Sequence, residues 1–406
     1  MPPRLIGAVL SVTLLGVAVW ILYTSSSQSR VPLVFSASQI LHATWQDYKR
    51  TYLEAGTSRT LDPTRDYITT SEGQSYSMLR SVWLADQETF DASWKWAKDN
   101  LQHRNGDHLF SWLFGKNSAG AYGVLTERGG HNSASDADTD IALSLLFAYG
   151  RWQDHRYLGD ARVIMTDIWN KEVITIAGVP YLLSDNTQKS NRSIAIINPS
   201  YLNPAAYHLF AKFDNAHPWD ALASSSYEIL ARSTSLSLDV SQSDGLPPDW
   251  IGINTQTGAL SVLASPPHST GFGFEALRIP WRLALDWEWF GEPRAKEVLS
   301  HFSFLRDEWK AHRKLARIYG HDGTPLDSVE SSAIYGGTLG YFLVAEPALA
   351  TEIYQSKLAP LYDPGTSTWQ PKLSYYDDNW VWFGIALYSH ALPDLTRDLP
   401  VSAFRQ

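Results

Sequence analysis

Apolar residues recur every three or four positions along most of the chain, from about residue 35 to residue 392. This spacing puts them on one face of an α-helix, so it predicts an all-α chain with brief strands in its connections, at residues 179–183 and 251–262. The twelve helices expected are residues 38–52, 72–86, 90–102, 136–153, 156–169, 204–213, 221–233, 274–289, 293–310, 333–344, 348–357 and 376–392.

The first 34 residues have a different pattern. No charged residue falls between Arg4 and Arg30, and the apolar stretch 5–23 would span about 28 Å as a helix, which is close to the thickness of a bilayer core. A cleaved signal peptide usually has a shorter apolar stretch followed by an A-x-A-like site. The pattern therefore favours an uncleaved transmembrane signal-anchor, with the rest of the chain exported to the periplasm or the cell exterior. Cleavage and secretion are the alternative.

The chain shows no change of composition after this segment that would mark a second domain. We therefore expect residues 1–34 to form the anchor and a short linker, residues 35–392 one helical domain, and residues 393–406 a C-terminal tail. Three long loops rich in Gly, Ser, Asn and Pro, at 115–135, 184–203 and 241–270, are expected to carry function.

Composition excludes several classes of protein. The net charge of −9 argues against nucleic acid as a partner, and the lack of cysteine excludes disulfides and thiolate metal sites. The histidines show no spacing typical of metal ligands, so neither a metal nor another cofactor is expected. Aromatic residues make up 13% of the chain. So many flat rings suit either a large core or a groove in which sugar rings stack.

A first polar motif, at residues 69–76, opens a predicted helix. Ser71 and Gln74 have the spacing of a capping box, and Glu72 suits the positive end of the helix dipole. Gly73 is a poor helix former, and it is more natural where a bulky group approaches the backbone. The residues alone favour a structural role here over a catalytic one.

A second motif carries three aspartates, Asp136, Asp138 and Asp140, at another helix start. Ser135 is the expected cap, and three acids exceed what capping requires. Asp136 and Asp140 lie on one face, where they repel each other, and Asp138 points elsewhere. A calcium site and a carboxylate-lined polysaccharide cleft are both compatible with this pattern.

A third motif, at residues 271–282, contains Glu275 and Arg278. These two could form an ordinary ion pair on a helix surface. The glycine-rich approach, the aromatic neighbours and Pro280 favour instead a helix start that faces a cleft.

Together these segments resemble glycoside hydrolase family 8, formerly cellulase family D. The resemblance lies in TSEGQSYSMLR, SASDADTDIALSLLFAYGRW and FEALRIPWR, with NPSY and YYDDNW as further matches, and it runs from about residue 40 to residue 392. Within the family, DYITTSEGQSY, NPSYLNP and PPDW are most similar to the periplasmic endoglucanase type encoded beside bacterial cellulose synthases. The resemblance implies an (α/α)6 barrel of six inner and six outer helices with a groove across one end.

The resemblance also implies roles for individual residues. Family members cleave β-1,4-linked glycans with inversion, using an acid that protonates the leaving oxygen and a base that activates water, roughly 6.5–9.5 Å apart. Glu72 matches the acid. Asp138, supported by Asp136, matches the residue that holds the sugar at the cleavage point, and Tyr201 one that positions the water. Arg278 would orient the base or bind a sugar hydroxyl. The positions that stack sugar rings are Trp112, Phe274, Tyr375 and Tyr376.

At one position the chain departs from the family. Cellulases of this type carry an aspartate as base where this chain has Glu275. The extra methylene would carry the carboxylate about 1 Å further or fold it back, and displacements of that size can cost ~100-fold in rate. Asp244 and Asp249, in the preceding loop, are the alternative bases.

The sequence thus predicts an exported, membrane-anchored endo-β-1,4-glucanase that trims cellulose or a related exopolysaccharide, and a polysaccharide synthase complex is an expected partner. Two alternatives remain. The first is a relative acting on another β-glycan, such as xylan, mixed-linkage glucan or chitosan, with loops 115–131 and 241–268 setting the substrate. The second is a glycan-binding relative weakened in catalysis by Glu275.

Overall fold

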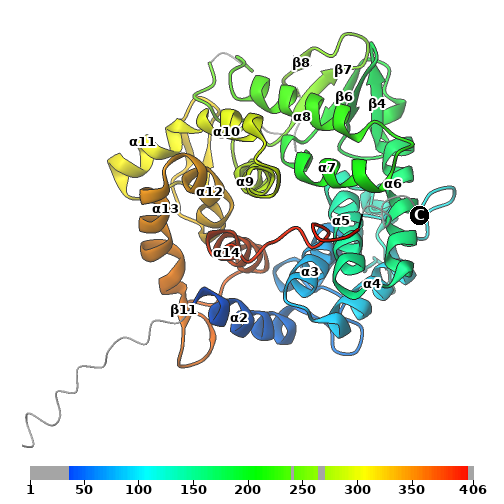
Figure 1. Cartoon of the computed structure of the whole chain (residues 1–406), viewed down its shortest axis with the longest axis horizontal. Coiled ribbons are helices and arrows are strands. Elements are labelled where there is room, and N and C mark those ends of the chain that lie inside the picture. Colours follow the sequence, from blue (N-terminus) through cyan, green and yellow to red (C-terminus); the bar gives the residue numbers. More distant parts are fainter. Residues whose placement is uncertain (1–35, 239–241, 264–269, 401–406) are drawn as a thin grey trace, which may run out of the picture. The chain divides into compact units, whose positions relative to one another are not determined.

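The computed structural model describes residues 36–238, 242–263 and 270–400, and thirteen α-helices lie within these ranges (Figure 1). The predicted mostly helical fold is confirmed. Six of the helices form an inner ring in which sequence neighbours pack on one another. They are α3 (Ser71–Trp83), α5 (Ser135–Trp152), α7 (Pro204–Phe213), α9 (Ile279–Phe290), α12 (Ser332–Ala345) and α14 (Tyr375–Tyr388).

An outer set of helices covers the inner ring. α4, α6, α8, α10 and α13 each pack on an inner helix next to them in sequence, and α2 packs on α14. Arg80 of α3 and Asp378 of α14 close the ring through a buried ion pair of 2.9 Å. This arrangement is consistent with the (α/α)6 barrel implied by the resemblance. The outer helices are α2 (Ala37–Tyr52), α4 (Gln87–Leu101), α6 (His155–Glu172), α8 (Trp219–Ser233), α10 (Pro293–Ser300), α11 (Ser303–His312) and α13 (Pro347–Ile353).

Inner helices are buried on nearly all sides, because they contact two inner neighbours and one outer helix. Glycines allow a close approach between α12 and α14. A Cβ atom on Gly384 would lie 2.5 Å from the Cα of Gly336, so neither helix has room for a side chain at this crossing.

Most helix boundaries shift by one to four residues from the prediction, and two predicted helices differ more. The helix expected over 274–289 begins only at Ile279, after a 3-10 turn at Ala276–Arg278. The helix expected over 293–310 is divided into α10 and α11. The chain turns between them because Phe302 is fully buried and the carbonyl of His301 packs against Gly245.

The two predicted serine caps are wrong. Thr70, not Ser71, caps α3 by accepting from the N–H of Gly73. Gln74 makes no capping box, because its side chain accepts from Thr60 in the preceding loop. Ser135 lies inside the first turn of α5, where its buried hydroxyl donates to the carbonyl of Leu183. In both places the burial of the helix start supplies the serine with tertiary surroundings that its sequence neighbours do not indicate.

Short antiparallel strands link the helices at the cavity end and elsewhere. Only those near 179–183 and 251–262 were expected, because two- to four-residue strands have too few positions to show an alternating pattern. The sheets are β1 (Thr69–Thr70), β2 (Leu113–Lys116) and β3 (Tyr122–Val124); β4 (Val173–Ile176) and β5 (Val179–Leu182); β6 (Ile194–Ile197), β7 (Ile251–Asn254) and β8 (Leu260–Ser261); β9 (Ile318–Tyr319) and β10 (Pro325–Asp327); β11 (Tyr362–Asp363) and β12 (Thr368–Trp369).

The segment after α14 closes the end of the ring where α3, α5 and α9 finish. The indole of Trp83 donates to the carbonyl of Pro393, and that of Trp289 donates to Leu392. Leu395 lies against Gly150 of α5, where a Cβ atom would meet its carbonyl oxygen at 2.2 Å. The part of the predicted tail that the structure describes therefore packs on the barrel.

The predicted anchor at 1–34 lies outside the described residues, as do residues 264–269 of the third loop and the tail beyond residue 400. Within the residues that are described, none of the helices has the length and apolar character needed to span a bilayer.

The glycine contact between α12 and α14 makes a test of the fold. We expect Gly384→Ala to lower the free energy of unfolding by about 1–3 kcal/mol, because the methyl group would overlap the backbone of Gly336. Gly159→Ala is the control, since the same change on the open face of α6 meets nothing within 4 Å and should stabilise by about 0.5–1 kcal/mol. Urea unfolding of both variants measures the difference, and equal effects would contradict the tight crossing.

Candidate active site

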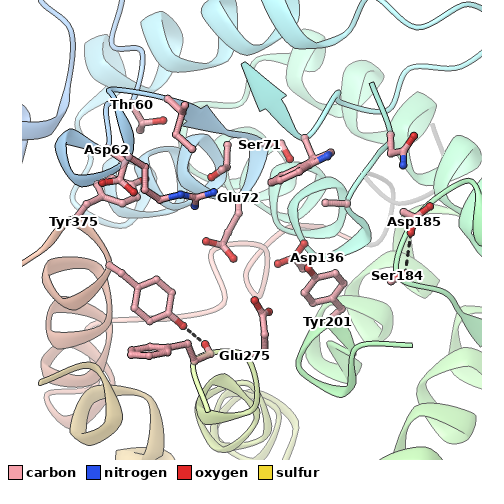
Figure 2. A pocket seen from close by; sticks show the side chains of 18 of the residues that line it. Thr60, Asp62, Ser71, Glu72, Asp136, Ser184, Asp185, Tyr201, Glu275 and Tyr375 are labelled. Atoms are coloured by element: carbon pink, nitrogen blue, oxygen red, sulfur yellow. Dashed lines mark hydrogen bonds between the residues drawn. The ribbon is translucent and has the colours of Figure 1, made fainter. Parts of the chain in front are cut away.

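A cavity of about 1020 Å³ lies at the end of the ring where the inner helices begin. Glu72 and Asp136 reach it from the first turns of α3 and α5, and Glu275 from just before α9. Figure 2 shows these three carboxylates pointing into one space with Tyr201 beside them. Eight of the ten predicted site residues line the cavity: Glu72, Trp112, Asp136, Tyr201, Phe274, Glu275, Tyr375 and Tyr376.

Arg278 lies directly behind this wall and is fully buried. Its guanidinium contacts Glu72, Glu275 and, at 3.2 Å, Asp136. The structure therefore replaces the surface ion pair considered for Glu275 and Arg278 by a buried cation shared among three carboxylates. A guanidinium has five N–H donors in a fixed plane, which suits it to several carboxylates at once.

Asp136 is the most deeply buried of the three carboxylates. Burial raises the pKa of Asp136 to about 7; Arg278 opposes the rise and Glu72 reinforces it. A carboxyl of this kind is partly protonated at neutral pH, so it can donate a hydrogen bond as well as accept one. That capacity suits contact with a sugar hydroxyl.

Glu275 is held by residues from two further segments. Asn198 donates to its carboxylate at 2.9 Å. Asp249 supports the turn beneath it, since one Asp249 oxygen accepts the backbone N–H groups of Gly273, Glu275 and Ala276 at 2.8–3.2 Å. Burial raises the pKa of Asp249 to about 6.

The alternative bases lie outside this geometry. Asp249 does not line the cavity and is engaged as the acceptor for a turn. Asp244 is exposed near Gly323 and is also absent from the cavity wall. Of the three candidate bases, Glu275 alone lines the cavity together with Glu72.

The placement of Asp138 differs from the prediction. It is fully buried behind the cavity wall, where it accepts the N–H of Phe110 at 2.9 Å and faces Glu172. Asp136 takes the cavity position instead. The two aspartates are two positions apart, so they point to different sides of α5, and its packing decides which one faces the cavity.

The repulsion expected between Asp136 and Asp140 is relieved by arginines. Arg282, one turn after Arg278 on α9, binds both oxygens of Asp140 at 2.8 and 2.9 Å. Asp140 thus pairs with Arg282, while Asp136 shares Arg278 with Glu72 and Glu275.

Gly73 lies where the sequence suggested a close approach. A Cβ atom at this position would stand 2.1 Å from the hydroxyl oxygen of Tyr375. The expectation of a bulky neighbour is confirmed, and the neighbour is one of the predicted sugar-binding residues.

The predicted stacking residues have different degrees of exposure. Phe274 is 36% exposed and Tyr375 only 8%. Tyr376 donates to the carbonyl of Phe274, and the indole of Trp112 donates to Gly129 at 2.9 Å, so both rings are fixed at the cavity wall. Phe274 and Trp112 offer the more open aromatic surfaces, and the buried Tyr375 offers only an edge.

Several cavity residues were missed by the sequence analysis. Trp250 stands edge-on to Tyr201 at 5.8 Å, and Asp185 and Gln188 line the wall formed by the second long loop. Asn198 and Trp250 fall within the NPSY and PPDW segments, so a closer reading of those segments could have found them. Asp185 and Gln188 carry no distinguishing local pattern.

A pair of carboxylates in a cavity with aromatic walls is typical of a site that cleaves glycosidic bonds. Among the described residues, no group of three His, Asp or Glu side chains could hold a metal ion. The fold and the site together therefore define the glycoside hydrolase class.

The chain belongs to glycosyl hydrolases family 8, whose family model matches residues 19–373. It is 30% identical over 280 residues, 66% of this chain, to endoglucanase 2 of Ruminiclostridium josui, and 31% identical over 217 residues, 53% of this chain, to the endoglucanase of Escherichia coli K12. The structure of the endo-β-1,4-glucanase CMCax from Acetobacter xylinum has a similar fold. Its TM-score is 0.68 at 22% identity, covering 88% of this chain and 99% of that one.

The chain spans 55% of the length of each of those two sequence relatives. Membership of the family therefore fixes the class, and the activity is argued separately.

Arg278 should control the protonation of Asp136 in the cavity wall. A carboxyl with a raised pKa in the folded protein favours folding while protonated, and this contribution is lost as pH rises through the folded pKa, here about 7 for Asp136. Arg278→Met removes the opposing charge, so we expect the variant to lose more thermal stability than the wild type between pH 5 and pH 8.

Arg278→Lys keeps a positive charge and is the control for this measurement. Its melting temperature should follow the pH dependence of the wild type more closely than that of Arg278→Met. Parallel pH curves for Arg278→Met and the wild type would show that Arg278 does not set the charge balance of the cavity.

Proposed function

We propose that this protein is an inverting endo-β-1,4-glucanase acting on cellulose or a closely related exopolysaccharide. The observation that carries the proposal is that Glu72, Asp136 and Glu275 line one cavity whose walls also carry aromatic rings. The endoglucanase names of the relatives support the choice of substrate.

In this proposal Glu72 is the general acid. It stands on the first turn of α3, from which its carboxyl reaches a glycosidic oxygen in the cavity. Glu275 is the general base and activates water on the opposite face of the sugar. Tyr201, whose ring lies 5.4 Å from the Arg278 guanidinium, borders the space for that water.

Asp136 takes the role that the sequence assigned to Asp138. Its partly protonated carboxyl lies on the cavity wall next to Arg278, where it can bind a hydroxyl of the sugar at the cleavage point.

The contacts of Glu275 account for how a base longer than aspartate fits the site. Its carboxylate is folded back onto Arg278 and Asn198, which absorbs the extra methylene. Because Glu72 contacts the same guanidinium, bound substrate must separate the two carboxylates to admit water, for which inverting enzymes use about 6.5–9.5 Å.

The same contact favours one alternative. Glu275 is held by the buried Arg278, and a slow or glycan-binding relative would show the same contact. Action on xylan, mixed-linkage glucan or chitosan would use the same carboxylates with other wall contacts.

For the location, we propose that residues 5–23 form an uncleaved signal-anchor and that the barrel works in the periplasm or outside the cell. An enzyme tethered there would be placed to trim a polymer as a membrane-bound polysaccharide synthase extrudes it. The uncharged stretch between Arg4 and Arg30 supports this arrangement.

The activity is tested by product release from cellopentaose and xylopentaose by the full chain, with NMR of the anomeric signals. We expect α-anomeric products from cellopentaose. Glu72→Gln and Glu275→Ala should each lose at least 1000-fold in kcat, since each removes a proton-transfer group. Glu275→Asp should keep measurable activity because it restores a shorter carboxylate.

Three results would point elsewhere. Retained activity in Glu275→Ala would exclude Glu275 as base. Faster cleavage of xylopentaose than of cellopentaose would indicate xylan as the substrate in place of cellulose. Binding of cellopentaose without any cleavage would favour the binding relative.

The anchor is tested by fractionating bacteria that express the full chain. We expect the protein to remain in the membrane fraction after carbonate extraction, and a variant lacking residues 5–23 to leave it. Terminal sequencing supplies the control. A mature N-terminus beyond residue 23, together with a protein free of the membrane, would identify a cleaved signal peptide.

A further inference from the structure

Behind the cavity wall, two buried carboxyl groups face each other. Asp138 of α5 and Glu172, the last residue of α6, are both 0% exposed. Asp138 Oδ1 accepts the N–H of Phe110 at 2.9 Å, and Glu172 Oε1 accepts the hydroxyl of Ser133 at 2.6 Å. One oxygen of each group is therefore occupied by a conventional donor.

The other two oxygens have only each other. Asp138 Oδ2 and Glu172 Oε2 are buried and receive no N–H or hydroxyl donor from the described residues, and the two carboxyl groups are hydrogen-bonded to each other. Two ionised carboxylates this close would repel strongly in a buried site, whereas one shared proton turns the contact into a hydrogen bond.

The neighbouring charges do not remove the need for this proton. Arg104 favours ionisation of Asp138, but it is already paired with Asp107 at 2.8 Å. The negative charge of Asp107 raises the pKa of Asp138, and that of Asp185 raises the pKa of Glu172. Burial is the largest effect on both groups: it raises the pKa of Asp138 to about 7 and that of Glu172 well above its ordinary value.

The pair is connected to the cavity by one residue. Ser133 lines the cavity and donates its hydroxyl to Glu172. Its backbone N–H donates to the Asn186 side chain, and its Oγ accepts the backbone N–H of Asn186, both at 2.9 Å. Asn186 lies between the wall residues Asp185 and Gln188. The position of this wall therefore depends on how Glu172 is held.

We propose that Asp138 and Glu172 share a single proton and that this bond positions the Ser133–Asn186 part of the cavity wall for the glycan. The two carboxyls are positioning residues, since neither lines the cavity. This inference rests on the proposed function only for the identity of the glycan. Loss of the shared proton at higher pH separates the pair and releases the wall.

Amide substitutions give a direct test. In Glu172→Gln, the amide can still accept from Ser133 and can donate to Asp138; in Asp138→Asn, the amide can accept from Phe110 and donate to Glu172. Both variants keep the hydrogen bond without the titrating proton. The wild type loses stability as pH rises through the raised pKa of the pair, so we expect both variants to show a smaller fall in melting temperature between pH 5 and pH 8.

The wall is followed by hydrogen exchange of the full chain, in peptides covering residues 131–137 and 184–190. Glu172→Ala removes the acceptor of Ser133 and leaves Asp138 unpaired. We expect it to speed exchange in both peptides at least tenfold, while Glu172→Gln stays near the wild type at pH 5 and more protected than the wild type at pH 8. If Glu172 only filled space, Glu172→Gln and the wild type would exchange at the same rate at every pH.

Asp286→Asn is the matched control. Asp286 is also 0% exposed and has a pKa raised to about 6 by burial, but it bonds to Tyr227 away from the cavity. It should alter the pH dependence of melting without changing exchange in either wall peptide. Unchanged pH dependence in both amide variants, or protected wall peptides in Glu172→Ala, would overturn the proposal.

Glycan binding tests whether the Asp138–Glu172 pair matters for the proposed function. In a Glu72→Gln background, the affinity for cellopentaose should fall about tenfold with Glu172→Ala and recover with Glu172→Gln. If cellopentaose is neither bound nor cut, the glucanase proposal fails, and melting and exchange still decide whether the proton is shared.

Discussion

One buried guanidinium organises the site. Arg278 binds carboxylates that arrive from the starts of α3 and α5 and from the turn before α9, so it joins three separate stretches of chain at one point. Without it, these carboxylates would face one another across a partly dehydrated space, and removing one partner of a buried ion pair typically costs about 3–5 kcal/mol. The ion pair between Arg282 and Asp140 lies one turn after the ion pair between Arg278 and Asp136. These two buried ion pairs hold α5 and the start of α9 together. The positions of the proposed acid, base and sugar-holding residue follow from this framework.

The direction of the inner helices is a second constraint. Their starts surround the cavity, and the partial positive charge at a helix start favours nearby carboxylates. Glu72, Asp136 and Asp377 all stand in such first turns and line the cavity. This explains why the conspicuous acidic motifs of the sequence coincide with capping-like patterns. The same residues satisfy a local rule for helix starts and line a cavity, and local rules alone cannot separate the two roles.

Much of the fold could be predicted because helical periodicity extends over many turns, and Glu72 and Glu275 were placed in one site through the family resemblance. What escaped prediction depends on tertiary contacts. Asp136 and Asp138 are equivalent in sequence, and only the rotation of α5 brings one to the cavity and the other to Glu172. Ser71 and Ser135 resemble caps, but burial gives them other surroundings. Glu172 lies at the end of an ordinary outer helix, with no signal that it faces another carboxyl.

The closure of the barrel by its last residues has a consequence for how the protein is made. α2 packs on α14, and the segment from Leu392 to Thr396 seals the end of the ring against Trp83 and Trp289. α2, the first of the described helices, can therefore complete its packing only after α14 has been synthesised, and the segment from Leu392 to Thr396 follows both. Contacts between chain ends are slow to form because the whole intervening chain must first be brought together. A nascent chain cut short before Leu392 would leave indole groups and helix ends uncovered, and such open surfaces are what chaperones and proteases recognise in incomplete proteins.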